Sequence, residues 1–579
     1  MRSSFLLFPL LAAPLAAQSI ECVTTHESGL PAGGSQPAMT PDATFVAFIT
    51  SAALVPSDTN GLPDVYVRER ASGAIERVSR TVSGADTDGE STNPSISADG
   101  RFVVFTSRAN NLLPAPLPGG VARVYVRDRV TATTALVSAS SGGVASNGTS
   151  GNAQVARDGR YVVFQSSANN LVANDANASI DVFRRDLQAG TTVCVTVDLA
   201  GTPRGGVSEP LTRCSLSADG RFVAFDSAYS ALTTDDTDGL CDVFVRDMLA
   251  GVTTLVSVSS SGVDGDHHSV GPALSADGNV VAFHSRATNL VPAHGAFYDV
   301  YVHELLTHTT TIASVSSAGL PTSALLPAQD HVSISGDGRF VTFWSDAPDL
   351  VAAGHGGLFL RDRLLGTTRC IGDDALGRHG GGAVPQWVPV SDDGRVVAFT
   401  DAGAALVRPD TNGVADVFLV DAQGSFATFC DTDVSLGCPC AGAVFPGRAC
   451  GNSVFADGAQ LEAGGGASVS NDTVRLDASQ LTGSACLFLA GDAADVLVGT
   501  WSGDGLSCVG GTLVRIGSQR VNGHTSSYPA SGDAPLSVRL GTPPPGSRRY
   551  VQAVYRNAAS FCTPGTSNRT NAVAVLFAP

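Results

Sequence analysis

Three loops of this chain carry the oxygen-rich residues that bind hard metal ions. In each loop an Asp is followed two residues later by Asp or Asn, then by Gly, and then by a further Asp. The residues are Asp58, Asn60 and Asp64, then Asp236, Asp238 and Asp242, then Asp410, Asn412 and Asp416. Alternating carboxylate and amide oxygens can wrap a calcium ion when the Gly permits the sharp turn that brings them together. The sequence therefore predicts calcium as a cofactor at these loops.

The same pattern has a simpler interpretation. Asp and Asn side chains form hydrogen bonds to the nearby backbone and stabilise turns without any metal. A fourth loop, from Asp175 to Asp181, keeps the oxygens but lacks the Gly. Ordinary acidic turns therefore stay open as the alternative to calcium sites.

A second group combines histidines with carboxylates in adjacent segments of one repeat. Its members are Asp264, Asp266, His267, His268 and His294. Such side chains bind transition metals or act as acid and base, and exposed loop residues are the alternative. The sequence contains no Gly-x-Ser-x-Gly, His-Glu-x-x-His or Gly-x-x-x-x-Gly-Lys motif. No catalytic residue is therefore assigned.

A repeated phrase shows which elements must position these loops. The phrase, roughly Ser-x-Asp-Gly-Arg-Phe-Val-x-Phe-x-Ser, occurs seven times at intervals of 56 to 61 residues. Its Asp falls at Asp42, Asp99, Asp158, Asp219, Asp277, Asp337 and Asp393. A fixed period of this size is typical of propellers and solenoids, and Asp-Gly is a favoured two-residue hairpin turn between strands. The sequence therefore predicts an all-β fold, a seven-bladed β-propeller over residues 18–430.

Both ends of this region offer strands that can close the ring. Residues 20–25 match the outer-strand phrase at Thr191–Thr196, and the last repeat ends near Phe426–Cys430. Both ends can therefore serve the seventh blade. A disulfide between Cys22 and Cys430 would lock that seam, although spacing alone does not establish it.

Two phrases carry a resemblance to a known family. The segment starting at Pro94, Pro-Ser-Ile-Ser-Ala-Asp-Gly-Arg-Phe-Val-Val-Phe-Thr-Ser, and the segment Asp242–Asp247 resemble the WD40-like propeller repeat of the TolB family, called PD40. The resemblance covers about 410 residues and implies a propeller of seven blades. The family includes translocation proteins, peptidase propeller domains and other secreted proteins, so the fold does not decide the function.

The two ends of the chain indicate export. Residues 1–17 combine a charged start, an apolar core and small residues, which predicts a secretory signal peptide. The segments Asp504–Gly511, Arg549–Arg556 and Thr570–Val575 resemble a recurrent C-terminal domain of exported bacterial proteins, here a Cys-rich domain over residues 431–579. Of the twelve cysteines, five precede residue 430 and seven follow from there. Because exported chains use even cysteine counts for disulfides, we expect a smaller, disulfide-stapled domain similar to a β-sandwich.

The net charge of the chain and the strand directions in the predicted blades limit its possible functions. The net charge of −18 opposes nucleic-acid binding, and no later apolar run is long enough to span a bilayer. Alternating strands place the acidic loops on the same face as the long loops before each first strand, here called the long-loop face, where binding is expected. We therefore expect a secreted, periplasmic or cell-surface, non-enzymatic scaffold that recognises a protein or glycan. The alternatives are a polysaccharide lyase or hydrolase with its site on this face, and a TolB-like periplasmic assembly factor.

Overall fold

The computed structural model describes most of the propeller region and separate segments of the C-terminal region. The described residues are 20–26, 31–117, 120–205, 214–292, 298–322, 332–351, 356–371, 387–402, 412–422, 426–429, 460–464, 475–479, 481, 485–491, 493–494, 500–502, 505–507, 509–510, 513–530, 533–541, 548–556 and 567–576. The predicted signal peptide at 1–17, together with Asp410, His294 and Cys430, lies outside them.

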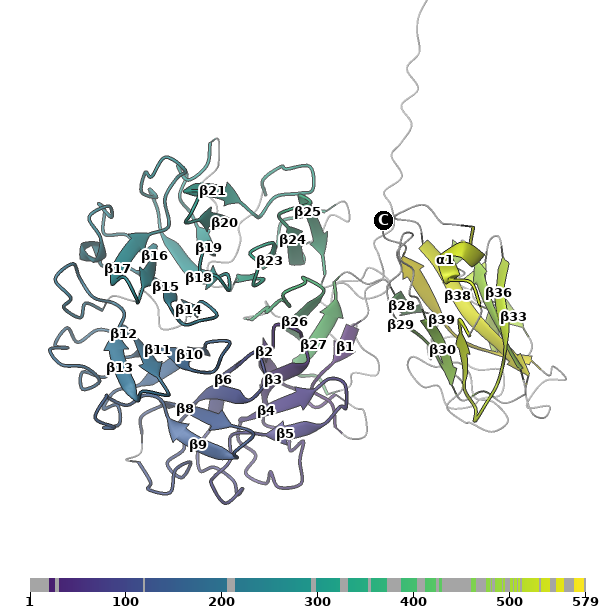
Figure 1. Cartoon of the computed structure of the whole chain (residues 1–579), viewed down its shortest axis with the longest axis horizontal. Helices are drawn as coiled ribbons and strands as arrows, with labels where there is room; N and C mark the ends of the chain where they lie inside the picture. The colour runs from purple at the N-terminus through teal and green to yellow at the C-terminus, as the bar shows by residue number, and fades with distance from the viewer. Residues whose placement is uncertain are drawn as a thin grey trace, which may run out of the picture. The chain divides into compact units, whose positions relative to one another are not determined.

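Seven antiparallel sheets succeed one another between residues 20 and 422, and Figure 1 shows them arranged in a ring. In six of these blades, four strands pair in chain order. Blade 1 contains β2 (Ser35–Met39), β3 (Phe45–Thr50), β4 (Asp64–Glu69) and β5 (Ile75–Arg77); blade 2 contains β6 (Ser91–Ile96), β7 (Phe102–Ser107), β8 (Arg123–Asp128) and β9 (Thr133–Leu136); blade 3 contains β10 (Ser150–Val155), β11 (Tyr161–Ser166), β12 (Asp181–Asp186) and β13 (Thr191–Cys194). Blade 4 contains β14 (Ser215–Leu216), β15 (Phe222–Ser227), β16 (Asp242–Asp247) and β17 (Val252–Leu255), with a 3-10 turn at Ser230–Leu232; blade 5 contains β18 (Ser269–Leu274), β19 (Val280–Ser285), β20 (Asp299–Glu304) and β21 (Thr309–Ile312); blade 6 contains β22 (Ser333–Ile334), β23 (Phe340–Ser345), β24 (Gly357–Asp362) and β25 (Thr367–Cys370). The predicted all-β, seven-bladed propeller is confirmed.

The N-terminal strand closes the ring. In blade 7, β26 (Val396–Asp401) pairs with β27 (Asp416–Asp421), and β1 (Ile20–Cys22) is the outermost strand, with Cys22 opposite Phe418. The expected contribution of the N-terminus is therefore present, and the ring has no open seam at this blade.

The end of the last repeat belongs elsewhere. The strand β28 (Phe426–Phe429) pairs with β39 (Ser567–Leu576) of the C-terminal unit, which begins at Gln423. The expectation that this segment would also serve the seventh blade is therefore wrong, because β1 already covers the outer edge of β27. Since Cys430 lies outside the described residues, its pairing with Cys22 stays a prediction.

Each blade is held by an aromatic pair between its second and third strands. In blade 1 the rings of Phe48 and Tyr66 stack with centroids 6.0 Å apart, and in blade 4 those of Phe225 and Phe244 stack at 5.8 Å. All four residues are buried. Offset stacking of this kind adds to the stabilisation that burial of the rings provides. The second and third strands are therefore rigid supports for the loop between them.

The Asp-Gly turns show why glycine recurs in the phrase. Gly100 has a φ of +70°, and a Cβ there would lie 2.4 Å from Cδ2 of Phe45 in the preceding blade. Only glycine satisfies both the left-handed backbone and this close approach. The first repeat has Ala43 in the same left-handed conformation, with a φ of +57°.

The C-terminal unit contains two larger sheets. One has the order β28, β39, β38 (Arg548–Arg556), β31 (Ala485–Gly491) and β36 (Val514–Arg520); the other has the order β29 (Gln460–Gly464), β30 (Arg475–Ser479) and β37 (Ser526–Tyr528). Its described residues also form two short pairs, β32 (Ala493–Ala494) with β35 (Val509–Gly510) and β33 (Thr500–Ser502) with β34 (Gly505–Ser507), and one short helix, α1 (Leu536–Arg539). Leu461, Phe488 and Val551 join one buried cluster across the two larger sheets, as in a β-sandwich.

The disulfide staple of this unit stays a prediction. Among its cysteines only Cys486 is described, and it is buried without a disulfide, with burial raising the pKa of its thiol to about 12. Within the described part of the chain, none of the helices has the length and apolar character needed to cross a membrane.

Candidate metal centre

The blade architecture fixes the last Asp of each acidic loop. In blades 1 and 4 this residue opens the third strand, where Asp64 lies opposite Thr50 and Asp242 lies opposite Ser227. The carboxylate accepts a hydrogen bond from a serine just beyond the outer strand. Ser79 donates to Asp64 at 2.5 Å, and the matching bond to Asp242 is 2.6 Å. Each of the two loops therefore ends at an equivalent aspartate whose carboxylate is fully buried and held by a serine.

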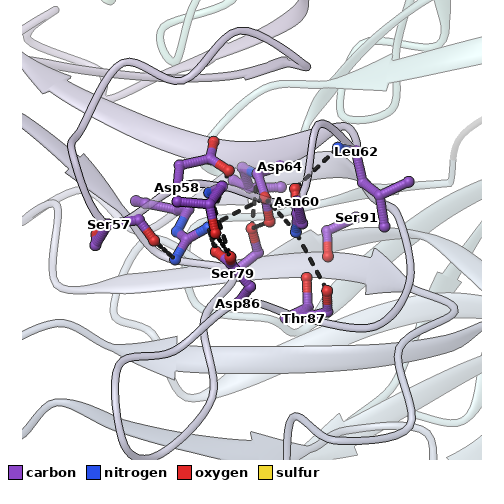
Figure 2. A network of polar contacts seen from close by, with 12 residues as sticks. Ser57, Asp58, Asn60, Leu62, Asp64, Ser79, Asp86, Thr87 and Ser91 are labelled. Atoms are coloured by element: carbon purple, nitrogen blue, oxygen red, sulfur yellow. Dashed lines mark hydrogen bonds and ion pairs between the residues drawn. The ribbon is translucent and has the colours of Figure 1, made fainter.

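In blade 1 the acidic loop surrounds an arginine. Figure 2 shows the side chains of Asp58, Asp64 and Asp86 converging on one point. There Nη1 of Arg77 lies 3.2 Å from Asp58, 3.5 Å from Asp64 and 2.5 Å from Asp86. The hydroxyl of Tyr66 also donates to Asp58. The guanidinium group therefore supplies the positive charge that the three carboxylates require.

The pKa shifts in blade 1 follow from these contacts. Burial raises the pKa of Asp64, although the Ser79 hydrogen bond and the charge of Arg77 offset part of that rise. Hydrogen bonds from Thr59 and Arg77 lower the pKa of Asp86. Burial alone would lower the pKa of Arg77, but the hydrogen bond to Asp86 and the nearby carboxylates raise it overall. The cluster is thus compensated within the protein.

Blade 4 contains one more carboxylate at the matching place. Oxygen atoms of Asp236, Asp238, Asp242 and Asp264 all lie within 4.8 Å of one another. Asp236 is 6% exposed and Asp242 is fully buried. Both oxygens of Asp236, Oδ2 of Asp242 and Oδ1 of Asp264 have no hydrogen-bond partner among the described residues. None of the ion pairs formed by that part of the chain involves these four carboxylates.

The groups that compensate blade 1 are replaced by apolar side chains in blade 4. On the outer strand Arg77 lies opposite Tyr66, and at the same register Leu255 lies opposite Phe244. Blade 4 therefore loses the guanidinium and the phenol hydroxyl together. It also has Asp238 where blade 1 has an asparagine. Buried carboxylates without partners are costly, so either protonation or a bound cation would stabilise this arrangement.

Electrostatics in blade 4 differ accordingly. Burial, reinforced by the charges of Asp264, Asp236 and Asp238, raises the pKa of Asp242 to about 7. Burial, with the nearby charges of Asp264 and Asp238, likewise raises the pKa of Asp236, and burial raises the pKa of Asp264. An oxygen-only donor set of this kind suits calcium, magnesium or manganese better than zinc or copper.

The remaining acidic loops are satisfied by hydrogen bonds where they are described. In blade 7, Oδ1 of Asp416 accepts from the Thr24 hydroxyl at 2.6 Å and from the Gly33 amide at 2.9 Å, and Oδ2 accepts from Asn412 at 2.8 Å. The first residue of that loop, Asp410, lies outside the described residues.

Blade 3 shows the same solution. Asp181 accepts from the Thr196 hydroxyl at 2.6 Å and from Asn177 at 2.9 Å. The position of Asp264, which forms an isolated bridge with Val258 in blade 4, is occupied by Pro203 in blade 3. Among the described loops, four carboxylates therefore meet in blade 4 alone.

The histidine group does not assemble in its described members. Nδ1 of His268 accepts the backbone N–H of Cys241 at 3.0 Å, and so supports the acidic loop. Nδ1 of His267 lies 3.3 Å from Asp266, and both side chains are 40–50% exposed. Asp264, which the sequence grouped with these histidines, instead joins the carboxylates of blade 4. His294 lies outside the described residues.

Comparison with known proteins finds distant structural likenesses only. No protein-family profile matches this chain, and no curated protein sequence does. An oligogalacturonate lyase in complex with manganese is 13% identical, with a TM-score of 0.41, over 70% of this chain and 98% of that one. A TolB-type structure from Agrobacterium tumefaciens is 14% identical, with a TM-score of 0.29, over 49% and 80%. A puromycin-hydrolyzing peptidase from Mycobacterium tuberculosis is 13% identical, with a TM-score of 0.39, over 66% and 52%. At these values the likeness carries no argument about activity, ligand or metal.

Proposed function

We propose that this chain is an exported, non-enzymatic binding propeller whose blade 4 loops are organised by one calcium ion. The observation that carries the proposal is the set of partnerless buried oxygens on Asp236, Asp242 and Asp264, at the place where blade 1 holds Arg77. A divalent ion there would do for blade 4 what the guanidinium does for blade 1. Asp238 would complete the ligand set.

Calcium suits this site better than other hard cations. It accepts six to eight oxygen ligands in irregular geometry, whereas magnesium requires a near-ideal octahedron of smaller radius. The four carboxylates come from two segments, the loop before β16 and the loop before β18. An ion would therefore tie two loops of the long-loop face together. This face is where we place recognition of a protein or glycan.

The expected stabilisation is moderate. For a dissociation constant of about 10⁻⁴ to 10⁻³ M, typical of extracellular calcium modules, calcium at about 1 mM contributes roughly 0.4 to 1.4 kcal/mol. That shifts the equilibrium of a surface loop toward the ion-bound conformation by about two- to tenfold. No contact among the described residues favours the alternative functions of a lyase, a hydrolase or an assembly factor.

The test is thermal melting of the exported chain in excess chelator and then across a calcium titration. We expect the melting temperature to rise with calcium in the wild type and not in Asp236→Asn. A matched control is Asp181→Asn in blade 3, whose carboxylate is already satisfied by hydrogen bonds; the calcium-dependent rise should persist there. A wild-type melting curve that calcium leaves unchanged would overturn the proposal.

A further inference from the structure

The long-loop face contains a second feature, a groove between blades 2 and 3. Its volume is about 270 Å³, and it is formed where β6 and β7 of blade 2 meet β10 and β11 of blade 3. The strand ends that form it are those paired with the starts of the third strands, as Ser107 is paired with Arg123. The groove therefore opens on the same face as the acidic loops. This size is slightly below that of a site for a drug-sized ligand, so it suits a smaller molecule.

The groove is lined by a chain of carboxamides. Nδ2 of Asn93 donates to Oδ1 of Asn152 at 3.3 Å, and Nδ2 of Asn152 donates to Oε1 of Gln165 at 2.8 Å. The backbone N–H of Asn93 in turn donates to the Gln36 side chain of blade 1 at 2.7 Å. Carboxamides both donate and accept hydrogen bonds. Blades 2 and 3 thus line the groove with connected carboxamides that can exchange hydrogen bonds with hydroxyls, and Gln36 of blade 1 holds the backbone of Asn93.

The backbone is bent to place these side chains. Asn93 and Asn152 have left-handed φ values of 52° and 50°, and both strands shift register there as β-bulges. A bulge re-aims the side chain that it carries, and a left-handed conformation is uncommon outside glycine. In blade 5 the matching residue is Gly271, with a φ of 66°. The bulge is therefore shared, and in blade 1 the matching residue is Gln36, with a φ of 55°; the carboxamides that line the groove itself are those of blades 2 and 3.

The lining of the groove has no net charge. Glu90 and Arg108 are the charged residues among those lining it, and they form an ion pair of 3.1 Å at the rim with half-exposed side chains. The remaining polar lining consists of hydroxyls and carboxamides. Because the pair is neutral as a unit, the groove offers no net charge to a phosphate, a carboxylate or an amine.

Two details leave room and hydrogen-bonding capacity for a ligand. The Oγ1 atom of Thr106, a groove residue that is 8% exposed, has no hydrogen-bond partner among the described residues. Gly151 lies beside it, and a Cβ on this glycine would be 3.3 Å from that oxygen. The positions that match Gly151 are Thr92 in blade 2 and Val270 in blade 5, because each lies opposite the equivalent position of its own second strand. Side chains are thus tolerated in this strand, and blade 3 omits one where the groove lies.

We propose that the groove between blades 2 and 3 binds one uncharged sugar residue of a glycan. Sugar hydroxyls donate and accept hydrogen bonds at once, as the lining carboxamides and hydroxyls do. The inference rests on the proposed binding function and names the ligand class. It does not depend on the cation of blade 4.

The test uses the full exported chain and neutral methyl glycosides of glucose, galactose and mannose, with galacturonate as the charged comparator. Binding is followed by saturation-transfer NMR and calorimetry, in calcium and in chelator. We expect at least one neutral glycoside to bind with a dissociation constant on the order of 1 mM, and galacturonate to bind at least tenfold more weakly. Gly151→Thr should weaken binding at least tenfold, because the new side chain occupies the groove. Threonine is chosen because blade 2 has Thr92 at the matching position. Gln165→Leu should do the same by removing a carboxamide.

Val270→Thr in blade 5 is the matched control, since it changes the same register position away from the groove. Binding that is unaffected by Gly151→Thr, or the absence of binding by every neutral glycoside, would overturn the inference. If galacturonate binds as tightly as the neutral glycosides or more tightly, the inference that the ligand is uncharged is wrong. If no sugar binds while calcium still raises the melting temperature, the groove inference fails and the cation proposal stands. If sugar binds without any calcium effect, the cation proposal fails and the groove inference stands.

Discussion

Blades 1 and 4 are built on the same strands and solve the same electrostatic problem in different ways. In blade 1 three carboxylates share the guanidinium of Arg77. In blade 4 four carboxylates meet, and the position of Arg77 holds Leu255. In blade 1 an outer-strand arginine therefore compensates the acidic loop, whereas blade 4 has a leucine at that position and more carboxylates at the loop.

The largest effect should follow from Arg77→Leu, which gives blade 1 the outer-strand residue of blade 4. Asp58 and Asp64 would remain buried without their cation. Removing one partner of a buried ion pair costs about 3 to 5 kcal/mol of unfolding free energy. We expect a loss of that size in urea unfolding in chelator. Calcium should restore part of it, and a loss that calcium does not reduce would show that blade 1 cannot become a cation site.

The reciprocal change, Leu255→Arg, should make blade 4 independent of calcium. The new guanidinium would lie among Asp236, Asp242 and Asp264, as Arg77 lies among its carboxylates. In chelator the melting temperature should rise above that of the wild type, and the response to calcium should disappear. Leu255→Met is the control of similar size and no charge, and it should keep the calcium response. A Leu255→Arg protein that still responds to calcium would contradict the equivalence of the two blades.

The pH dependence of the unfolding free energy should differ between the calcium-free and the calcium-bound protein. The pKa of Asp242 is raised to about 7 in the folded chain, against about 3.9 when unfolded. Between these values the folded state binds the extra proton, so the unfolding free energy falls as pH rises, by at most about 1.4 kcal/mol per pH unit. The slope should level off above about pH 7. Urea unfolding in chelator from pH 4.5 to 8 measures it, and Asp242→Asn should remove this contribution.

The smallest effect should come from Tyr66→Phe, which gives blade 1 the aromatic residue of blade 4. The hydroxyl that donates to Asp58 is lost, while Arg77 still neutralises the carboxylate. We expect a loss of about 1 to 3 kcal/mol, the cost of leaving one buried acceptor unsatisfied. Urea unfolding measures it. Addition of calcium should not change the result, since a calcium response would mean that Arg77 no longer fills the site.

The fold was largely predictable, because the repeat period, the Asp-Gly turns and the outer-strand phrase at residues 20–25 are local sequence features. The prediction failed at Phe426–Phe429, which reads as an outer strand. Pairing of an alternating strand depends on which free edge it meets, and the edge of β27 was already taken by β1. Local pattern does not carry that information.

The site was predictable only in part. The loop residues Asp236, Asp238 and Asp242 are close in sequence and were identified together. Arg77 and Asp264 were missed as members of these clusters, because they come from other segments that only strand register brings to the loop. An alignment of the repeats with one another would have pointed to both residues, because each position differs between blades. The position of Arg77 holds leucine in blade 4, and the position of Asp264 holds proline in blade 3.

The most direct test of the central claim is the number of calcium ions bound per chain, measured by equilibrium dialysis on the wild type and on Leu255→Arg. We expect the wild type to bind calcium at blade 4 and Leu255→Arg to bind one ion fewer per chain. Equal numbers in the two proteins, or no calcium bound by the wild type, would contradict it.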